Sequence, residues 1–259
     1  MEHPLSLVAM FVTLHVGRYL LTAGAAWGLL WGWRANPFTA ARRIQHQRAG
    51  PGDLRREVLA SLRTAVLFGV VFGLLSVGLP VVPLTTSGPI AVVEFGAWLL
   101  ALLVVHDTYF YWSHRLAHHP AVFGWLHALH HQSRAPTPFA ALAFGVADAL
   151  VQVLWAVPLV RWAPVPSLVW FAFSFVAIAI NVLGHCGVEP FPAWWRSHPV
   201  FKWLNFATMH DLHHQQVRGN YGLYSSAWDR WMGTLLPLPD VSSPPAPAAA
   251  PAAPDPSGT

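Results

Sequence analysis

Histidine is the residue type in this chain whose spacing most clearly indicates chemistry. The chain has 15 histidines in 259 residues, and a His-x-x-His-His string occurs twice, at His127–His131 and at His210–His214. A third cluster, His114-Arg-Leu-Ala-His118-His119, precedes the first string. Short motifs arise by chance, but at this histidine frequency two copies of such a string are not expected. The clusters therefore indicate a metal site.

Helical spacing predicts how these side chains are arranged. Residues three and four apart are neighbours on one face of a helix, so the three histidines of each string are expected to point the same way. Eight imidazoles result, from His114, His118, His127, His130, His131, His210, His213 and His214. One tetrahedral zinc takes four ligands, so eight suit two metal ions. Imidazole favours iron, zinc, copper and nickel.

Other polar residues are weaker candidates around this site. His185 at the end of an apolar run is expected to be a ninth ligand, and Asn181, four residues earlier, is a further candidate. Asp107 and Tyr111 share a helical stripe with His114 and His118. A metal-bound imidazole often donates its second N–H to a carboxylate. Asp107 or Asp211 is expected to accept such a bond, and all four non-histidine residues are candidate catalytic positions.

The composition indicates that a membrane surrounds the elements that carry these residues. Hydrophobic residues make up 54% of the chain and charged residues only 10%, against about 25% charged in a soluble domain. The basic residues lie between apolar runs instead of gathering on one polar surface, which argues against nucleic-acid binding. Cys186 is the only cysteine, so no intramolecular disulfide forms, and we expect it to be a small buried hydrophobic residue.

Long apolar runs predict an all-α integral membrane bundle of four to five spans with a cytosolic histidine-rich helical cap. The runs are 4–33, 64–93, 89–105, 140–160 and 162–184. Arginines concentrate in the polar segments between them, so the positive-inside rule places these segments and the histidines in the cytoplasm. Five spans with the N-terminus outside fit this alternation, and so does a first span that dips in and returns.

The whole of 1–236 is expected to form one domain, with its motif-bearing core at about 90–236. The Pro- and Ala-rich run 237–259 is expected to be a disordered tail. The N-terminus lacks the pattern of a removable signal peptide.

These motifs resemble the sterol desaturase and fatty acid hydroxylase superfamily. The similar stretches are Asp107 to His118, the two His-x-x-His-His strings, Asn181 to Gly187, and the run containing Gly219-Asn-Tyr-Gly222, Trp228-Asp229-Arg230 and Gly233-Thr234. The resemblance implies a four-helix membrane bundle capped by a histidine-rich region that holds two iron ions. It also implies that the nine histidines named above are the ligands. Asn181 occupies a place where some fatty acid hydroxylases have a histidine, which favours the sterol-acting branch.

The function expected from this resemblance is oxygen-dependent hydroxylation or desaturation of a lipid at a sterol-like or fatty acyl C–H bond. Molecular oxygen is the oxidant, and electrons come from NAD(P)H through a separate carrier, either a cytochrome b type protein or a ferredoxin, with its reductase. No Gly-x-Gly-x-x-Gly string is present to bind the nucleotide directly. Two alternatives are a zinc-dependent membrane hydrolase and a metal transporter. The lipid, the carbon attacked, the choice between alcohol and alkene, the electron donor and the oligomeric state stay open.

Overall fold

The computed structural model describes residues 3–32, 37–45 and 48–238, and within these ranges the regular elements are all helical. The elements are α1 (Pro4–Ala26), η1 (Trp27–Gly32), α2 (Pro37–Ala41), α3 (Pro51–Leu75), α4 (Gly88–Ala117), α5 (Pro120–Leu126), η2 (His130–Gln132), η3 (Pro138–Leu142), α6 (Val146–Val153), α7 (Ala156–Trp162), α8 (Ser167–Gly184), η4 (Ala193–Arg196), η5 (Phe201–Trp203), α9 (Ala207–Gln216) and α10 (Ala227–Trp231). The all-α prediction is confirmed. His46, a histidine remote in sequence from the clusters, and residues 239–259 of the predicted tail lie outside the described residues.

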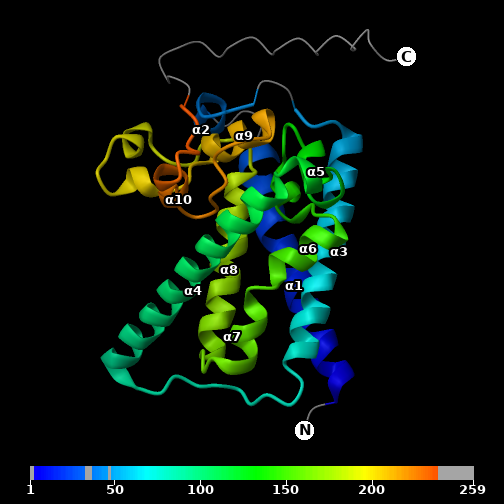
Figure 1. Cartoon of the computed structure of the whole chain (residues 1–259), viewed down its shortest axis with the longest axis vertical. Coiled ribbons are helices and arrows are strands. Elements are labelled where there is room, and N and C mark those ends of the chain that lie inside the picture. The colour runs from blue at the N-terminus through cyan, green and yellow to red at the C-terminus, as the bar shows by residue number, and fades with distance from the viewer. Residues whose placement is uncertain (1–2, 33–36, 46–47, 239–259) are drawn as a thin grey trace.

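Four helices are long and apolar enough to cross a membrane: α1 continued by η1 (Pro4–Gly32), α3, α4 and α8. Helix α4 has 30 residues, which is about 45 Å at 1.5 Å per residue, and it leans away from the other helices at its N-terminal end (Figure 1). Large apolar side chains such as Ile90, Val93 and Leu100 are exposed along it. Such a surface suits lipid, and the prediction of a membrane helical bundle is confirmed.

The expected continuous span over 140–160 is wrong. This stretch is divided among η3, α6 and α7, although the chain still passes through it from the histidine-bearing end to the opposite end before α8 returns (Figure 1). Gly145 caps the start of α6 in an extended conformation, and Pro158 lies in the first turn of α7, where proline is tolerated. The bundle thus has four long helices and one interrupted passage.

Close packing of α1 against α3 depends on two glycines of α3. A Cβ atom at Gly73 would lie 2.6 Å from the Cα atom of Val8, and one at Gly69 would overlap the backbone of Val12. Small residues four apart let membrane helices approach closely, because backbone contacts replace the hydrophobic effect that water supplies elsewhere. This packing brings α1 and α3 together as one wall of the bundle.

Short helices form a cap at one end of the bundle, where α2, α5, α9 and α10 gather (Figure 1). Asp107 of α4 joins this cap to the membrane helices, since its carboxylate accepts hydrogen bonds from the Tyr224 backbone N–H (2.8 Å) and the Ser225 hydroxyl. Asp229 accepts from the backbone N–H groups of Tyr221 and Gly222 at 2.9 and 2.8 Å. These bonds fix the 219–229 loop beside the histidines.

Candidate metal centre

Nine histidines converge at the boundary between the long helices and the cap. They form two groups, and within each group the nitrogens that can bind metal all lie within 4.8 Å of one another. The five-histidine group contains His114, His118, His127, His131 and His213, and the four-histidine group contains His130, His185, His210 and His214. All are buried except His118, which is half-buried. Each group can hold one metal ion.

Each His-x-x-His-His string contributes to both groups, so the expectation that its three imidazoles point the same way is wrong. In α9, His213 and His214 are about 100° apart around the helix axis, and this angle directs His213 to one group and His214 to the other. The first string is not one α-helix, because α5 ends before His127 and His130 begins the short 3₁₀ helix η2. A string thus bridges the two groups.

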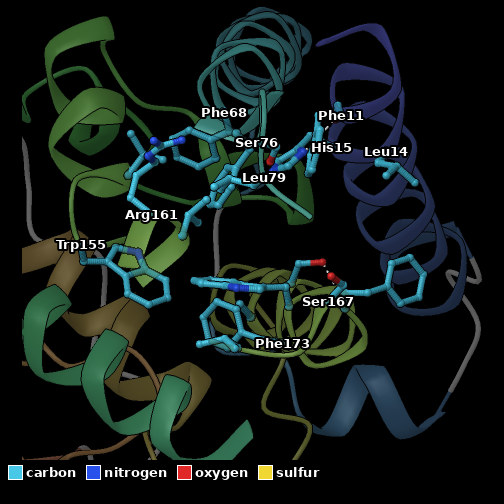
Figure 2. A pocket seen from close by; sticks show the side chains of 18 of the residues that line it. Phe11, Leu14, His15, Phe68, Ser76, Leu79, Trp155, Arg161, Ser167 and Phe173 are labelled. Carbon is cyan, nitrogen blue, oxygen red and sulfur yellow. Dashed lines mark hydrogen bonds between the residues drawn. The ribbon is translucent and has the colours of Figure 1, made fainter. Parts of the chain in front are cut away.

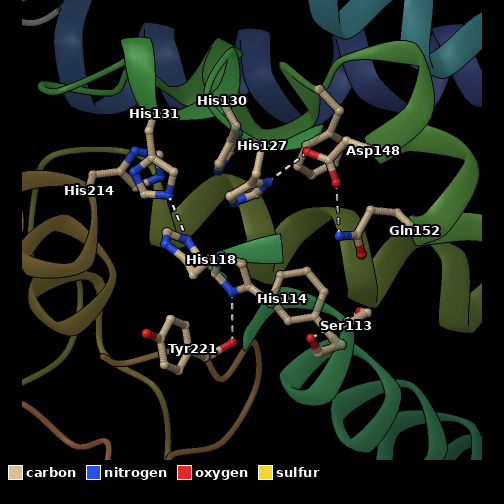
Figure 3. A network of polar contacts seen from close by, with 12 residues as sticks. Ser113, His114, His118, His127, His130, His131, Asp148, Gln152, His214 and Tyr221 are labelled. Atoms are coloured by element: carbon tan, nitrogen blue, oxygen red, sulfur yellow. Dashed lines mark hydrogen bonds and ion pairs between the residues drawn. The ribbon is translucent and has the colours of Figure 1, made fainter. Parts of the chain in front are cut away.

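Five of the imidazoles are oriented through their Nδ1 atoms. The acceptors are oxygens, so Nδ1 carries the proton and Nε2 keeps its lone pair. The bonds run from His114 to Tyr221 O (2.9 Å), His118 to Val217 O (3.0 Å), His127 to Asp148 Oδ2 (2.7 Å), His185 to Asn181 O (2.8 Å) and His213 to Gly219 O (2.6 Å). Figure 3 shows the His114 and His127 bonds. Backbone and carboxylate oxygens therefore select the tautomer that binds metal through Nε2.

The free nitrogens fit a cation. Nε2 of His114, His127 and His213 is buried without a hydrogen-bond partner, and an unpaired buried polar atom is costly. In the four-histidine group, Nε2 of His185 lies 2.9 Å from Nε2 of His210 and 3.4 Å from Nε2 of His130. Because His185 donates its Nδ1–H to Asn181 O, its Nε2 presents a lone pair to these two nitrogens, and this convergence suits a shared metal ion.

Burial favours the neutral form of several of these imidazoles. Burial first, and nearby imidazoles second, lower the pKa of His131 to about 2, that of His118 to about 3 and that of His185 to about 4. The pKa values of His210 and His214 are also well below 6.5 for the same reasons. Because only the neutral ring binds metal, these residues need lose no proton at pH 7.

The four non-histidine candidates contact the site indirectly or not at all. Asp107 binds the 224–225 backbone, and the Tyr111 hydroxyl lies 3.0 Å from Thr234 Oγ1. The Asp211 carboxylate accepts from Gln45 and Gln215 instead of from a histidine. Asn181 donates its side-chain amide to Ala141 O and supports His185 through its backbone oxygen. Neither Asp107 nor Asp211 has the predicted imidazole partner.

Asp148 is the carboxylate that accepts a hydrogen bond from a histidine of the site, the role that was expected for Asp107 or Asp211. It is fully buried on α6, and its carboxylate binds His127 Nδ1 and accepts from Gln152 Nε2 at 3.3 Å (Figure 3). The signal in the sequence was that Asp148 is the single charge in the apolar run 140–160. A lone carboxylate at membrane depth is costly and therefore functional by default.

Three described histidines outside the two groups, His106, His119 and His198, have other partners. His106 Nδ1 lies 2.6 Å from the Tyr224 hydroxyl, and its ring stacks on Trp155. His119 accepts from the Ala121 backbone N–H at the start of α5, and His198 accepts from Val200 N–H. These three residues serve local structure.

A large apolar cavity of about 1440 Å³ lies between the membrane helices. Aromatic side chains that include Phe11, Phe68, Trp155 and Phe173 line it (Figure 2). Its lining includes Phe144, whose ring centroid is 4.9 Å from that of His130. The cavity thus comes within one side chain of the four-histidine group.

Comparison with known proteins gives the family. The family model described as fatty acid hydroxylase matches residues 99–234, which contain all nine converging histidines. The chain belongs to the fatty acid hydroxylase family.

This fatty acid hydroxylase family member is similar to several curated proteins. It is 32% identical to Delta(7)-sterol 5(6)-desaturase ERG3B of Gibberella zeae over 57% of this chain and 46% of the relative. Identity to Delta(7)-sterol 5(6)-desaturase erg3C of Aspergillus fumigatus is 30%, over 76% of this chain and 68% of the relative. The very-long-chain aldehyde decarbonylase GL1-5 of Oryza sativa subsp. indica is 32% identical over 54% of this chain and 24% of the relative.

The chain spans about half the length of the two Gibberella zeae desaturases that it matches, 46% and 54%. No solved structure matches the chain.

Proposed function

We propose that this chain is a membrane oxidoreductase that binds two iron ions through nine histidines and uses O2 to hydroxylate or desaturate a lipid. The observation that carries the proposal is the pair of histidine groups, five and four, at the end of an apolar cavity. Family membership favours iron among the metals that imidazole binds. Relatives named as sterol desaturases and an aldehyde decarbonylase favour a lipid substrate.

Bound iron would supply the reductive activation of oxygen and the removal of hydrogen from an unactivated C–H bond, which side chains alone do not achieve. The chain's own residues hold and orient the ligands. The carbonyls of Tyr221 and Gly219 and the carboxylate of Asp148 keep the protons on Nδ1. Burial excludes bulk water from the ligands. The cavity positions the lipid with its apolar part among aromatic rings.

The electrons are proposed to come from NAD(P)H through a small carrier, a cytochrome b type protein or a ferredoxin, and its reductase. The histidine-bearing end is proposed to face the cytoplasm. Two observations support this orientation: the arginine-bearing residues 37–45 and 48–63 adjoin the cap, and α1 begins at the opposite end (Figure 1).

The geometry disfavours the two alternatives. A zinc hydrolase needs a general-base carboxylate beside an open metal position. Among the described residues, Asp148 is the carboxylate that is hydrogen-bonded to a histidine of either group. It contacts Nδ1 of His127, so it lies on the side of the imidazole opposite to the metal-binding Nε2 atom. A transporter binds its metal near the membrane midplane on discontinuous helices, whereas both groups lie at one end of the bundle.

Metal analysis and lipid profiling test the proposal. The full chain is purified anaerobically, iron is counted by mass spectrometry, and lipids of cells with and without the protein are compared. We expect two iron ions per chain and a lipid changed by one oxygen or by loss of two hydrogens. His127→Gln and His185→Gln should each lower the iron count, and His119→Asn, an exposed cap residue, should not. Fewer than two metals in the unaltered chain would refute the two-ion site.

A further inference from the structure

An arginine on the first membrane helix lines the cavity without a partner. Arg18 lies on α1, inside the span Pro4–Gly32, and is among the residues that border the cavity. Its Nε atom is buried and has no hydrogen-bond partner. No ion pair or side-chain hydrogen bond joins its guanidinium to any described residue. A charged group within a span is costly and indicates a ligand or pathway by default.

The positive charge of the cavity lining has no acidic counterpart among the described residues that form it. Arg18 and Arg161 both border the cavity, and its described lining contains no aspartate or glutamate. Arg161 is satisfied at the surface, where it donates to Leu75 O at 3.3 Å. Among the described residues no carboxylate of the lining balances the charge of Arg18, and the lining around it is mostly apolar.

Arg18 belongs to the end of the cavity that adjoins the histidines. Its neighbour Tyr19 packs in one core cluster with Phe144 and Ile178, and Phe144 lies against His130. His106 also borders the cavity. Its Nδ1 atom lies 2.6 Å from the Tyr224 hydroxyl, so Arg18 and a hydrogen-bonded histidine share the lining of this cavity.

We propose that the cavity takes a lipid with one carboxylate, which the Arg18 guanidinium binds. The inference rests on the proposed function only in treating this cavity as the substrate site. A planar guanidinium matches a carboxylate through two parallel hydrogen bonds. One uncompensated cation balances one negative charge, which a carboxylate carries, whereas a phosphate monoester carries about −1.5 to −2 at pH 7. A neutral alcohol would leave the charge of Arg18 unpaired.

Photo-crosslinking tests the inference without metal or oxygen. The full chain in phosphatidylcholine nanodiscs is labelled with a diazirine palmitate, and the labelled peptides are mapped by mass spectrometry. Palmitate, hexadecanol and hexadecyl phosphate then compete with the label. We expect labelling of cavity residues and competition by palmitate at about tenfold or more lower concentration than by hexadecanol, as expected for a charge-assisted bond.

Variants locate the anion. Arg18→Met should remove the preference for palmitate, Arg18→Lys should keep part of it, and Arg161→Met, at the other arginine of the lining, should leave it unchanged. Equal competition by palmitate and hexadecanol in the unaltered protein would overturn the inference, as would unchanged preference in Arg18→Met or no labelling of the cavity. Tighter competition by hexadecyl phosphate would overturn the carboxylate assignment. A low iron count would leave these results untouched, so the two proposals fail separately.

Discussion

Replacement of Asp148 by asparagine should weaken metal binding at one histidine group and spare the other. Asp148 and His127 are both 1% exposed, and their hydrogen bond measures 2.7 Å. The carboxylate accepts from two donors, His127 Nδ1–H and Gln152 Nε2–H. The two donors contact different carboxylate oxygens. An asparagine of the same shape has an NH2 group in place of one of these oxygens, so it can accept at only one of the two positions.

The imidazole adapts by changing its tautomer. If the asparagine amide donates to His127 Nδ1, the ring proton moves to Nε2, and Nε2 then has no lone pair for a metal. Loss of the charge-assisted bond costs about 1.5–3 kcal/mol. Loss of a partner that supports a metal ligand typically lowers affinity about 10- to 100-fold, which is about 1.4–2.7 kcal/mol. The two estimates agree, and both concern the five-histidine group.

The assay is iron retention against a graded series of chelator concentrations, with iron counted per chain. Asp148→Asn should lose about half of its iron at chelator concentrations that leave the unaltered protein loaded. Asp211→Asn is the matched control, because this buried carboxylate beside His210 binds Gln45 and Gln215. The double variant Asp148→Asn, Gln152→Met removes the competing donor and should regain part of the affinity. Full retention of both ions by Asp148→Asn would refute the tautomer argument.

Two further predictions concern the bundle. Gly69→Leu should lower the free energy of unfolding by about 1–3 kcal/mol or more through overpacking against α1, whereas Gly96→Leu, with open space around its Cβ position, should not; thermal denaturation in one detergent compares them. Burial raises the pKa of the Cys186 thiol to about 12, so the reactive thiolate is scarce below that pH. Iodoacetamide at pH 8 should alkylate Cys186 only after unfolding, and mass spectrometry that finds the folded protein modified would contradict its burial.

The sequence was sufficient to predict which histidines converge, and their role as ligands stays a prediction. Two short strings and a third cluster carried that information, because spacings of three and four place side chains near one another on a helix. The division into two groups was not predictable in the same way. It depends on the angle of about 100° around the helix axis between His213 and His214. It also depends on the 3₁₀ helix η2, in which His130 points to a different group from His127.

The apolar run 140–160 shows why composition alone misplaced one element. Its hydropathy suits a span, but hydropathy does not register that Asp148 has a partner 21 residues earlier. A continuous helix would have to keep this carboxylate in lipid or in a dry core, where no hydrogen-bond donor is available to it. The interruptions around α6 let the segment turn Asp148 toward His127 while the chain still crosses the bundle. The break in the helix and the support of the metal ligand are therefore one feature, and a tertiary contact decides it.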